Sequence, residues 1–218
     1  MATPFRTCHR PRFAIIWLLL AGASVAHAYT IAITPASPRT IYLQVGVGSF
    51  TGGTLNSGGT PATNSTINVV SVSVPAAQVG NGTAQTMTTN STASISFLDN
   101  FAFCNLPNQL YVGGFYRSTS ATAGSATATL QASVPANLVN GTGQTIPFSR
   151  ISWTSSGNGD TGTQPFPAGT FVSGGTQAIG TISRNQWAES CHTFVYANTS
   201  IVASGTYTGR VTYTLSAP

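Results

Sequence analysis

The sequence carries very little charge, and this scarcity excludes several classes of function. From Tyr29 onward it contains no lysine, five arginines and three acidic residues, which are Asp99, Asp160 and Glu189. Arginines scattered in this way form no basic patch, so the composition argues against nucleic acid as a partner. Because the three acids lie far apart in the sequence, they suggest no carboxylate pair of the kind that hydrolyses glycosides.

Motifs for catalysis and for cofactor binding are also missing. No serine lies in a Gly-x-Ser-x-Gly elbow, no glycine-rich phosphate loop opens a helix, and no cysteine–histidine spacing fits a metal site. His192 is the only histidine after Tyr29, and its place beside Cys191 is typical of a packing or surface residue. Glu189 follows Arg184 by five residues, and we expect these side chains to pair. The sequence therefore predicts a non-enzymatic protein with no cofactor and no metal.

No apolar run is long enough to form a stable membrane span, and the longest one has the features of a secretory signal. Phe13–Ala23 is apolar but shorter than the ~20 residues of a transmembrane helix. Arginines precede it, and Ala26-His27-Ala28 supplies the small residues that a signal peptidase needs. We expect residues 1–28 to be a signal peptide and the protein to be secreted or held at the cell surface after export through the periplasm. The alternative is an uncleaved membrane anchor.

Cysteine is scarce as well. Cys8 lies in the predicted signal peptide, so that Cys104 and Cys191 are the two cysteines of the mature chain. An even number of cysteines in an exported chain predicts a disulfide, which here would close a loop of roughly 90 residues. The alternative, a metal site, lacks further ligands.

Helical patterns are nearly absent, whereas apolar and polar residues alternate along most of the chain. The alternation covers 41–47, 70–74, 126–134 and 207–216. This period is typical of strands with one buried face, and the segments between them are rich in turn residues. Only Arg184–Ser190 has the pattern of a short helical turn. These features predict an all-β fold, an antiparallel β-sandwich.

One short motif occurs twice in the predicted mature chain. Ser73–Ala76 and Ser133–Ala136 have the same sequence, and each is followed by a valine, Asn-Gly and Gln-Thr. In both copies we expect a strand to end at the proline, which cannot donate to a ladder. The copies are either two similar corners of one sandwich or parts of two small tandem domains. The long loop closed by the predicted disulfide favours a single domain over residues 29–218.

Alternating residues occur at both ends of the predicted mature chain. Ile31 and Ile33 follow the cleavage site, and Val211, Tyr213 and Leu215 alternate after Gly205 near the C-terminus. Together with the signal, the single disulfide and the Thr/Ser/Gly-rich composition, this layout resembles the fimbrial subunits of the chaperone–usher type. The alternative is that both ends are ordinary strands of the chain's own sheets.

The resemblance implies an incomplete immunoglobulin-like sandwich that is completed by a strand from a neighbouring subunit. The donor positions that it implies are Ile31 and Ile33, or Ile41, Leu43 and Val45. The residues that it places beside the acceptor site are Val211, Tyr213 and Leu215. Its implied partners are copies of the chain or related subunits, and a periplasmic chaperone that pairs with the acceptor edge before assembly.

A second hypothesis is a self-contained carbohydrate-binding or adhesion module that recognises a surface glycan. Exposed aromatic rings commonly bind sugars, and Trp153 and Trp187 are the candidate platforms. The alternative for each is burial in the sandwich, since a large ring contributes most to stability when it is covered.

Overall fold

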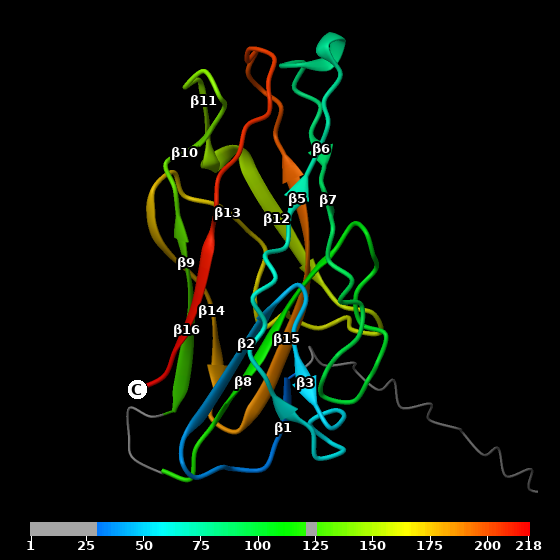
Figure 1. Ribbon diagram of the computed structural model, residues 1–218, viewed down its shortest axis with the longest axis vertical. Helices are drawn as coiled ribbons and strands as arrows, with labels where there is room; N and C mark the ends of the chain where they lie inside the picture. Colours follow the sequence, from blue (N-terminus) through cyan, green and yellow to red (C-terminus); the bar gives the residue numbers. More distant parts are fainter. Residues whose placement is uncertain (1–29, 121–125) are drawn as a thin grey trace, which may run out of the picture.

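The computed structural model describes residues 30–120 and 126–218, so the predicted signal peptide lies outside the described residues. Over these residues the regular structure consists of sixteen strands and two short 3-10 helices (Figure 1). Every strand pair is antiparallel, which confirms the expected all-β fold. No helix within the described ranges is long and apolar enough to cross a membrane.

The larger sheet is built around its longest strand, β15. Its strand order is β13-β12-β15-β8-β2, and β1 and β6 also pair with β15. One half of β15 lies between β8 and β1, and the other half lies between β12 and β6. The bounds are β1 (Thr30–Ala32), β2 (Thr40–Val45), β6 (Gln85–Thr86), β8 (Leu110–Arg117), β12 (Ile151–Ser156), β13 (Gly169–Thr170) and β15 (Gln186–Tyr196).

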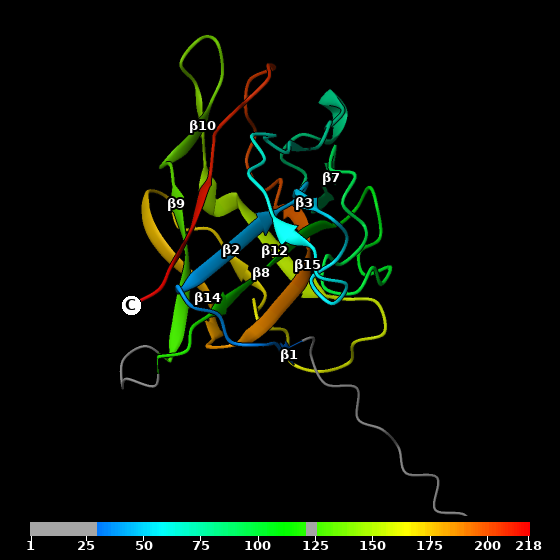
Figure 2. The same cartoon turned by 60° about the horizontal axis from the view of Figure 1, so that its bottom comes forward.

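A three-stranded sheet packs against the larger one and completes the β-sandwich (Figures 1 and 2). Its order is β14-β9-β16, with bounds β9 (Thr127–Val134), β14 (Gly175–Ser183) and β16 (Thr212–Ser216). Along β9 the apolar residues Ala128, Leu130, Ala132 and Val134 are buried, as the alternation predicts. They belong to the main core, a cluster that also contains buried residues of β8, β12 and β15.

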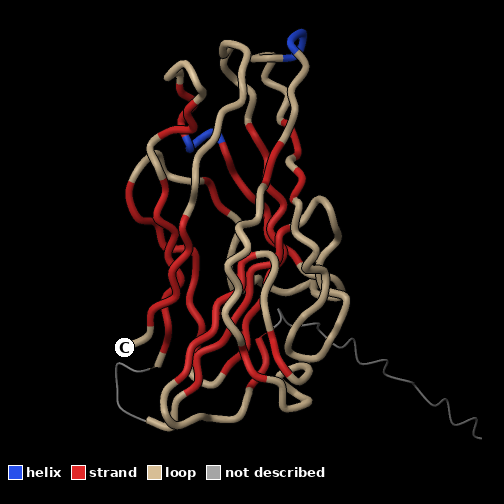
Figure 3. The backbone as a smooth tube through the Cα atoms, in the orientation of Figure 1, coloured by secondary structure: helices blue, strands red, loops and turns tan. Residues whose placement is uncertain are grey.

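Short ladders and two 3-10 helices lie in the connections between the strands of the two sheets (Figure 3). The ladders are β3 (Phe50–Thr51) with β4 (Thr60–Pro61), β5 (Val70–Ser71) with β7 (Thr88–Thr89), and β10 (Asn137–Val139) with β11 (Thr145–Pro147). The 3-10 helices are η1 (Ala76–Gln78) and η2 (Phe148–Arg150). The repeated motif therefore has two structures, since its first copy leads into η1 and its second copy leads from β9 into β10.

The larger sheet is covered on both faces, because loops pack a second cluster on the face away from the sandwich core. We call this the outer cluster; its buried members are Tyr42, Leu98, Phe115 and Trp187, with Ile31, Ile33, Phe50, Leu55 and Phe97 packed against them. Tyr42, Phe115 and Trp187 lie opposite one another on adjacent strands, with ring centroids 5.8–6.2 Å apart.

Burial on both faces explains why the expected helical turn at Arg184–Ser190 is wrong. Gln186–Tyr196 is strand β15, and Arg184 and Asn185 belong to the turn that precedes it. Residues on both faces of β15 are buried, so its sequence lacks the alternation that identifies a half-exposed strand. A short run of this kind cannot be told from a helix by periodicity.

The expected disulfide is confirmed. Cys104 lies in the loop before β8 and Cys191 lies within β15, with Cα atoms 5.6 Å apart. Both cysteines are buried with Phe103 and Tyr111 in a third small cluster. The bond therefore fixes a long loop to the central strand.

We predict that replacing both Cys104 and Cys191 by alanine lowers the free energy of unfolding by about 4 kcal/mol, because the bond closes a loop with a sequence separation of 87 residues in the unfolded chain. Urea denaturation of the oxidised protein and of the double variant measures the difference. The reduced native protein is the control and should unfold at nearly the same urea concentration as the variant. An unchanged midpoint in both would contradict this role.

Candidate functional site

Two of the three acids in the chain stabilise turns. The Oδ1 atom of Asp99 accepts a hydrogen bond from the backbone N–H of Phe101 at 2.9 Å. Asp160 accepts hydrogen bonds from the backbone N–H of Gly162 at 2.9 Å and from the Nε2 atom of Gln164 at 2.6 Å. These bonds hold local turns, which is the ordinary role of aspartate in loops.

The third acid, Glu189, is fully buried, and its expected pairing with Arg184 is wrong. Its Oε2 atom accepts hydrogen bonds from the hydroxyl of Tyr111 at 2.5 Å and from the Nε1 atom of Trp187 at 2.8 Å. Burial raises the pKa of the Glu189 carboxyl and that of the Tyr111 hydroxyl. Gly113 makes this contact possible, because a Cβ atom there would lie 2.5 Å from the Tyr111 hydroxyl oxygen. The carboxyl is thus a packing element of the sheet.

His192 also lies in the core rather than at a reactive surface. Its ring stacks on Trp153 with centroids 5.8 Å apart, and its Nε2 atom donates to the carbonyl oxygen of Phe166 at 3.3 Å. The side chain is completely buried, and this burial lowers its pKa to about 4. At neutral pH the ring is therefore an uncharged packing residue.

Neither candidate tryptophan forms an exposed platform. Trp153 is 4% exposed and donates its Nε1 hydrogen to the carbonyl oxygen of Pro167, and Trp187 is completely buried in the outer cluster. Both rings therefore follow the alternative of burial, which contradicts the hypothesis that they are exposed sugar platforms. Within residues 30–120 and 126–218, no three His, Cys, Asp or Glu side chains lie close enough together to hold a metal ion.

The burial pattern of β2 is the reverse of the one that its sequence predicts. Tyr42 and Gln44 are 8% and 2% exposed on the outer face of the sheet, where loops cover them. Ile41 is 44% exposed, and Leu43 and Val45 are half-buried although they pack against the sandwich core. The core is therefore incompletely covered along this strand. β2 pairs with β8 alone, so its other edge has no ladder partner among the described residues.

The strand β16 has the same two features at the edge of the smaller sheet. It pairs with β9 alone, and no described strand occupies its other edge. Val211 and Tyr213 are half-buried against the sandwich core, and Leu215 is buried. β16 and β2 lie close together, with Cα atoms within 8 Å, but no ladder joins them (Figure 2).

A segment next in the chain extends the open edge of β2. The side chain of Asn68 donates to the carbonyl oxygen of Val45 at 2.8 Å and accepts from the N–H of Val47 at 3.2 Å. Beyond it Val70, Val72 and Val74 are half-buried against the same core, and the residues between them are exposed. Only Val70–Ser71 forms a ladder, because the rest of this extended segment has no neighbouring strand among the described residues. The candidate site is therefore the pair of edges formed by β2 with residues 68–74 and by β16.

The first pair of expected donor residues lies within the chain's own fold. Ile31 is opposite Trp187 in the ladder of β1 with β15, and the N–H of Ile33 donates to the carbonyl oxygen of Asn185 at 2.8 Å. Both isoleucines pack against the outer cluster. No family model, curated protein or solved structure matches the chain.

We predict that the His192 imidazole titrates near pH 4 rather than near its ordinary 6.5, because protonation would place a charge in the core. The unfolded chain then binds the proton first as the pH falls. Stability contributed by this group is complete above pH 6.5 and is lost as the pH drops towards about 4, with a total of roughly 3 kcal/mol.

Proton NMR of the chain that begins at Tyr29 measures this pKa directly, since His192 is then the only histidine. Unfolding of His192→Gln as a function of pH is the control and should lack this part of the pH dependence. A ring signal that titrates between pH 6 and 7 would show that the ring is not held in the core.

Proposed function

We propose that this protein is an exported structural subunit that assembles by β-strand addition with copies of itself or with related subunits. The observation that supports the proposal is the pair of open edges on β2 and β16, each lined by alternating apolar residues that only half cover the sandwich core. In this proposal the protein has an architectural role and no catalytic one.

The chemistry of the two edges fits an added strand. Each edge presents backbone N–H and C=O groups that can join a ladder, and such edges pair readily with another chain. A strand with apolar residues at every second position would cover Leu43 and Val45 when it is added to β2, or Val211 and Tyr213 when it is added to β16. Completing the burial of each side chain contributes on the order of 1 kcal/mol, in addition to the main-chain hydrogen bonds.

The donor in this proposal is the segment Tyr29–Ser37 of another copy, which carries the alternating Ile31 and Ile33. In the isolated chain this segment pairs with β15 over only the three residues of β1. Exchange between copies would break this short ladder and the hydrogen bonds of Ile33 and Thr34 in one copy, and the same segment would form a new ladder in the other copy. A periplasmic chaperone that supplies a temporary strand would protect the same edges before assembly.

The test compares two substitutions at adjacent positions at the start of β16 in the protein that begins at Tyr29. Val211 is half-buried against the core and Thr212 is exposed. We expect Val211→Asp to weaken binding of a Tyr29–Ser37 peptide about tenfold or more, since a charge would enter the covered interface, whereas Thr212→Asp should leave it unchanged. Binding is measured on a chain that lacks residues 29–37, and assembly is measured as ladders that resist mild detergent.

A folded protein that stays monomeric at high concentration and binds no peptide would refute the proposal. Equal effects of the two substitutions would show that the apolar edge of β16 is not the contact.

A further inference from the structure

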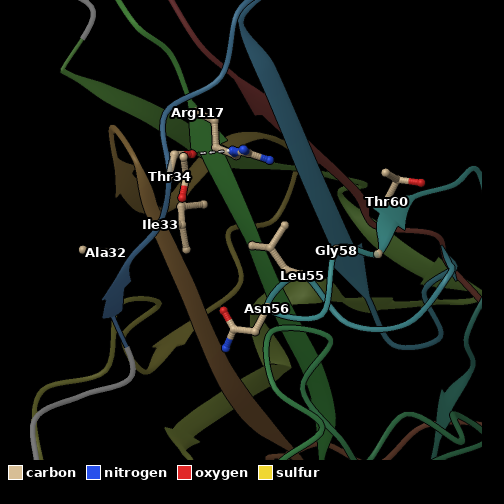
Figure 4. A pocket seen from close by; sticks show the side chains of 9 residues that line it. Ala32, Ile33, Thr34, Leu55, Asn56, Gly58, Thr60 and Arg117 are labelled. Atoms are coloured by element: carbon tan, nitrogen blue, oxygen red, sulfur yellow. Dashed lines mark hydrogen bonds between the residues drawn. The ribbon is translucent and has the colours of Figure 1, made fainter.

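A pocket of about 400 Å³ lies between the N-terminal segment and the loop that joins β3 to β4 (Figure 4). It is separate from the open edges of β2 and β16, so the inference below does not depend on the proposed function. The lining residues are Ala32, Ile33 and Thr34 on one side, Leu55, Asn56, Gly58, Gly59 and Thr60 on the other, and Arg117. Its size is in the range of sites that bind small organic molecules.

Arg117 gives the pocket a positive charge that no acidic side chain neutralises. It is the last residue of β8, and its Nε atom donates to the carbonyl oxygen of Thr34 at 2.7 Å. This bond orients the guanidinium, which also lies 5.8 Å from the ring centre of Phe115. Both Nη atoms lack a hydrogen-bond partner among the described residues. The chain has only three acids, two held in turns and one buried with Tyr111, so the guanidinium is available to an external anion.

The rest of the lining is suited to a polyhydroxylated ligand with one apolar face. The Asn56 amide and the Thr34 and Thr60 hydroxyls make no hydrogen bond in the described part of the chain, so they can bind ligand hydroxyls. Leu55 lies between Arg117 and Asn56 in Figure 4, and it offers an apolar contact. At Gly58 an added Cβ would meet nothing within 4 Å, so the pocket wall is open there.

We propose that this pocket binds a carboxylate-bearing sugar unit, a hexuronate. Its carboxylate would receive charge-assisted hydrogen bonds from the two Nη atoms of Arg117, whose fork matches a carboxylate. Its ring hydroxyls would reach Asn56 and Thr60, and the C–H face of the ring would cover Leu55. A neutral sugar would leave the guanidinium without a partner, and inorganic phosphate would use neither the amide nor the apolar wall.

The experiment is an NMR titration of the monomeric protein with methyl glucuronide, methyl glucoside and inorganic phosphate. We expect methyl glucuronide to bind with a Kd of about 1 mM, the strength typical of a ligand of this size, and the other two probes to bind at least about tenfold more weakly. Shifts should centre on the amides of residues 32–34 and 55–60.

Two variants and one control separate a binding role of Arg117 from a structural role. Arg117→Gln removes the guanidinium but also the bond to Thr34. Asn56→Asp leaves that bond intact and places a repelling carboxylate at the pocket, because the Asn56 side chain makes no hydrogen bond among the described residues. Both should weaken methyl glucuronide binding by about tenfold or more. Arg210→Gln, outside the pocket, changes the net charge by the same amount and should have no effect.

Three results would overturn the proposal. These are equal binding of methyl glucoside, an equal loss of affinity in Arg210→Gln, or the absence of shifts at these amides at about ten times the expected Kd.

Discussion

The rest of the structure depends on β15, because this strand is hydrogen-bonded along both edges and buried on both faces. Its first half connects β8 and β1, and its second half connects β12 and β6, so that it alone joins the two ends of the larger sheet. The disulfide attaches the loop before β8 to its middle at Cys191. Each buried backbone group of such a strand needs a partner, and these neighbours supply them.

The position of β15 also explains why the reactive residue types serve packing in this protein. Trp187, Glu189, Cys191 and His192 follow one another along the strand, and all are buried. Glu189 is held by Tyr111 and Trp187, and His192 by Trp153 and Phe166. The backbone edges and the loops differ from this strand, since the sandwich core is half covered there and Arg117 lacks a neutralising acid.

Much of the fold could be predicted from local patterns, whereas these patterns could not predict which strand edges are open. The alternation of apolar and polar residues predicted β9, and the even number of cysteines predicted the disulfide. Each of these predictions depends on only a few residues. Alternation did not identify β15, and the burial pattern of β2 is the reverse of the one that alternation predicts. In both strands the reason is that loops distant in sequence cover the outer face of the larger sheet. Pairing between distant segments decides which strand edge lacks a partner and which loop lies beside Arg117. The resemblance to fimbrial subunits implied a role in strand exchange for residues of β2 and β16, and the immunoglobulin-like topology stays a prediction.

The N-terminal segment takes part in both the proposed strand exchange and the proposed ligand pocket. Binding of a ligand and donation of the segment therefore oppose each other. Residues 30–34 provide one wall of the pocket through Ala32, Ile33 and Thr34, and the Thr34 carbonyl orients Arg117. The same residues belong to the proposed donor strand, so a copy that donates its N-terminal segment gives up this wall. A ligand that requires the wall then binds more tightly to the copy that retains its segment, and by linkage it opposes exchange by the same free energy. Occupation of the pocket would thus favour the monomer over the assembled form.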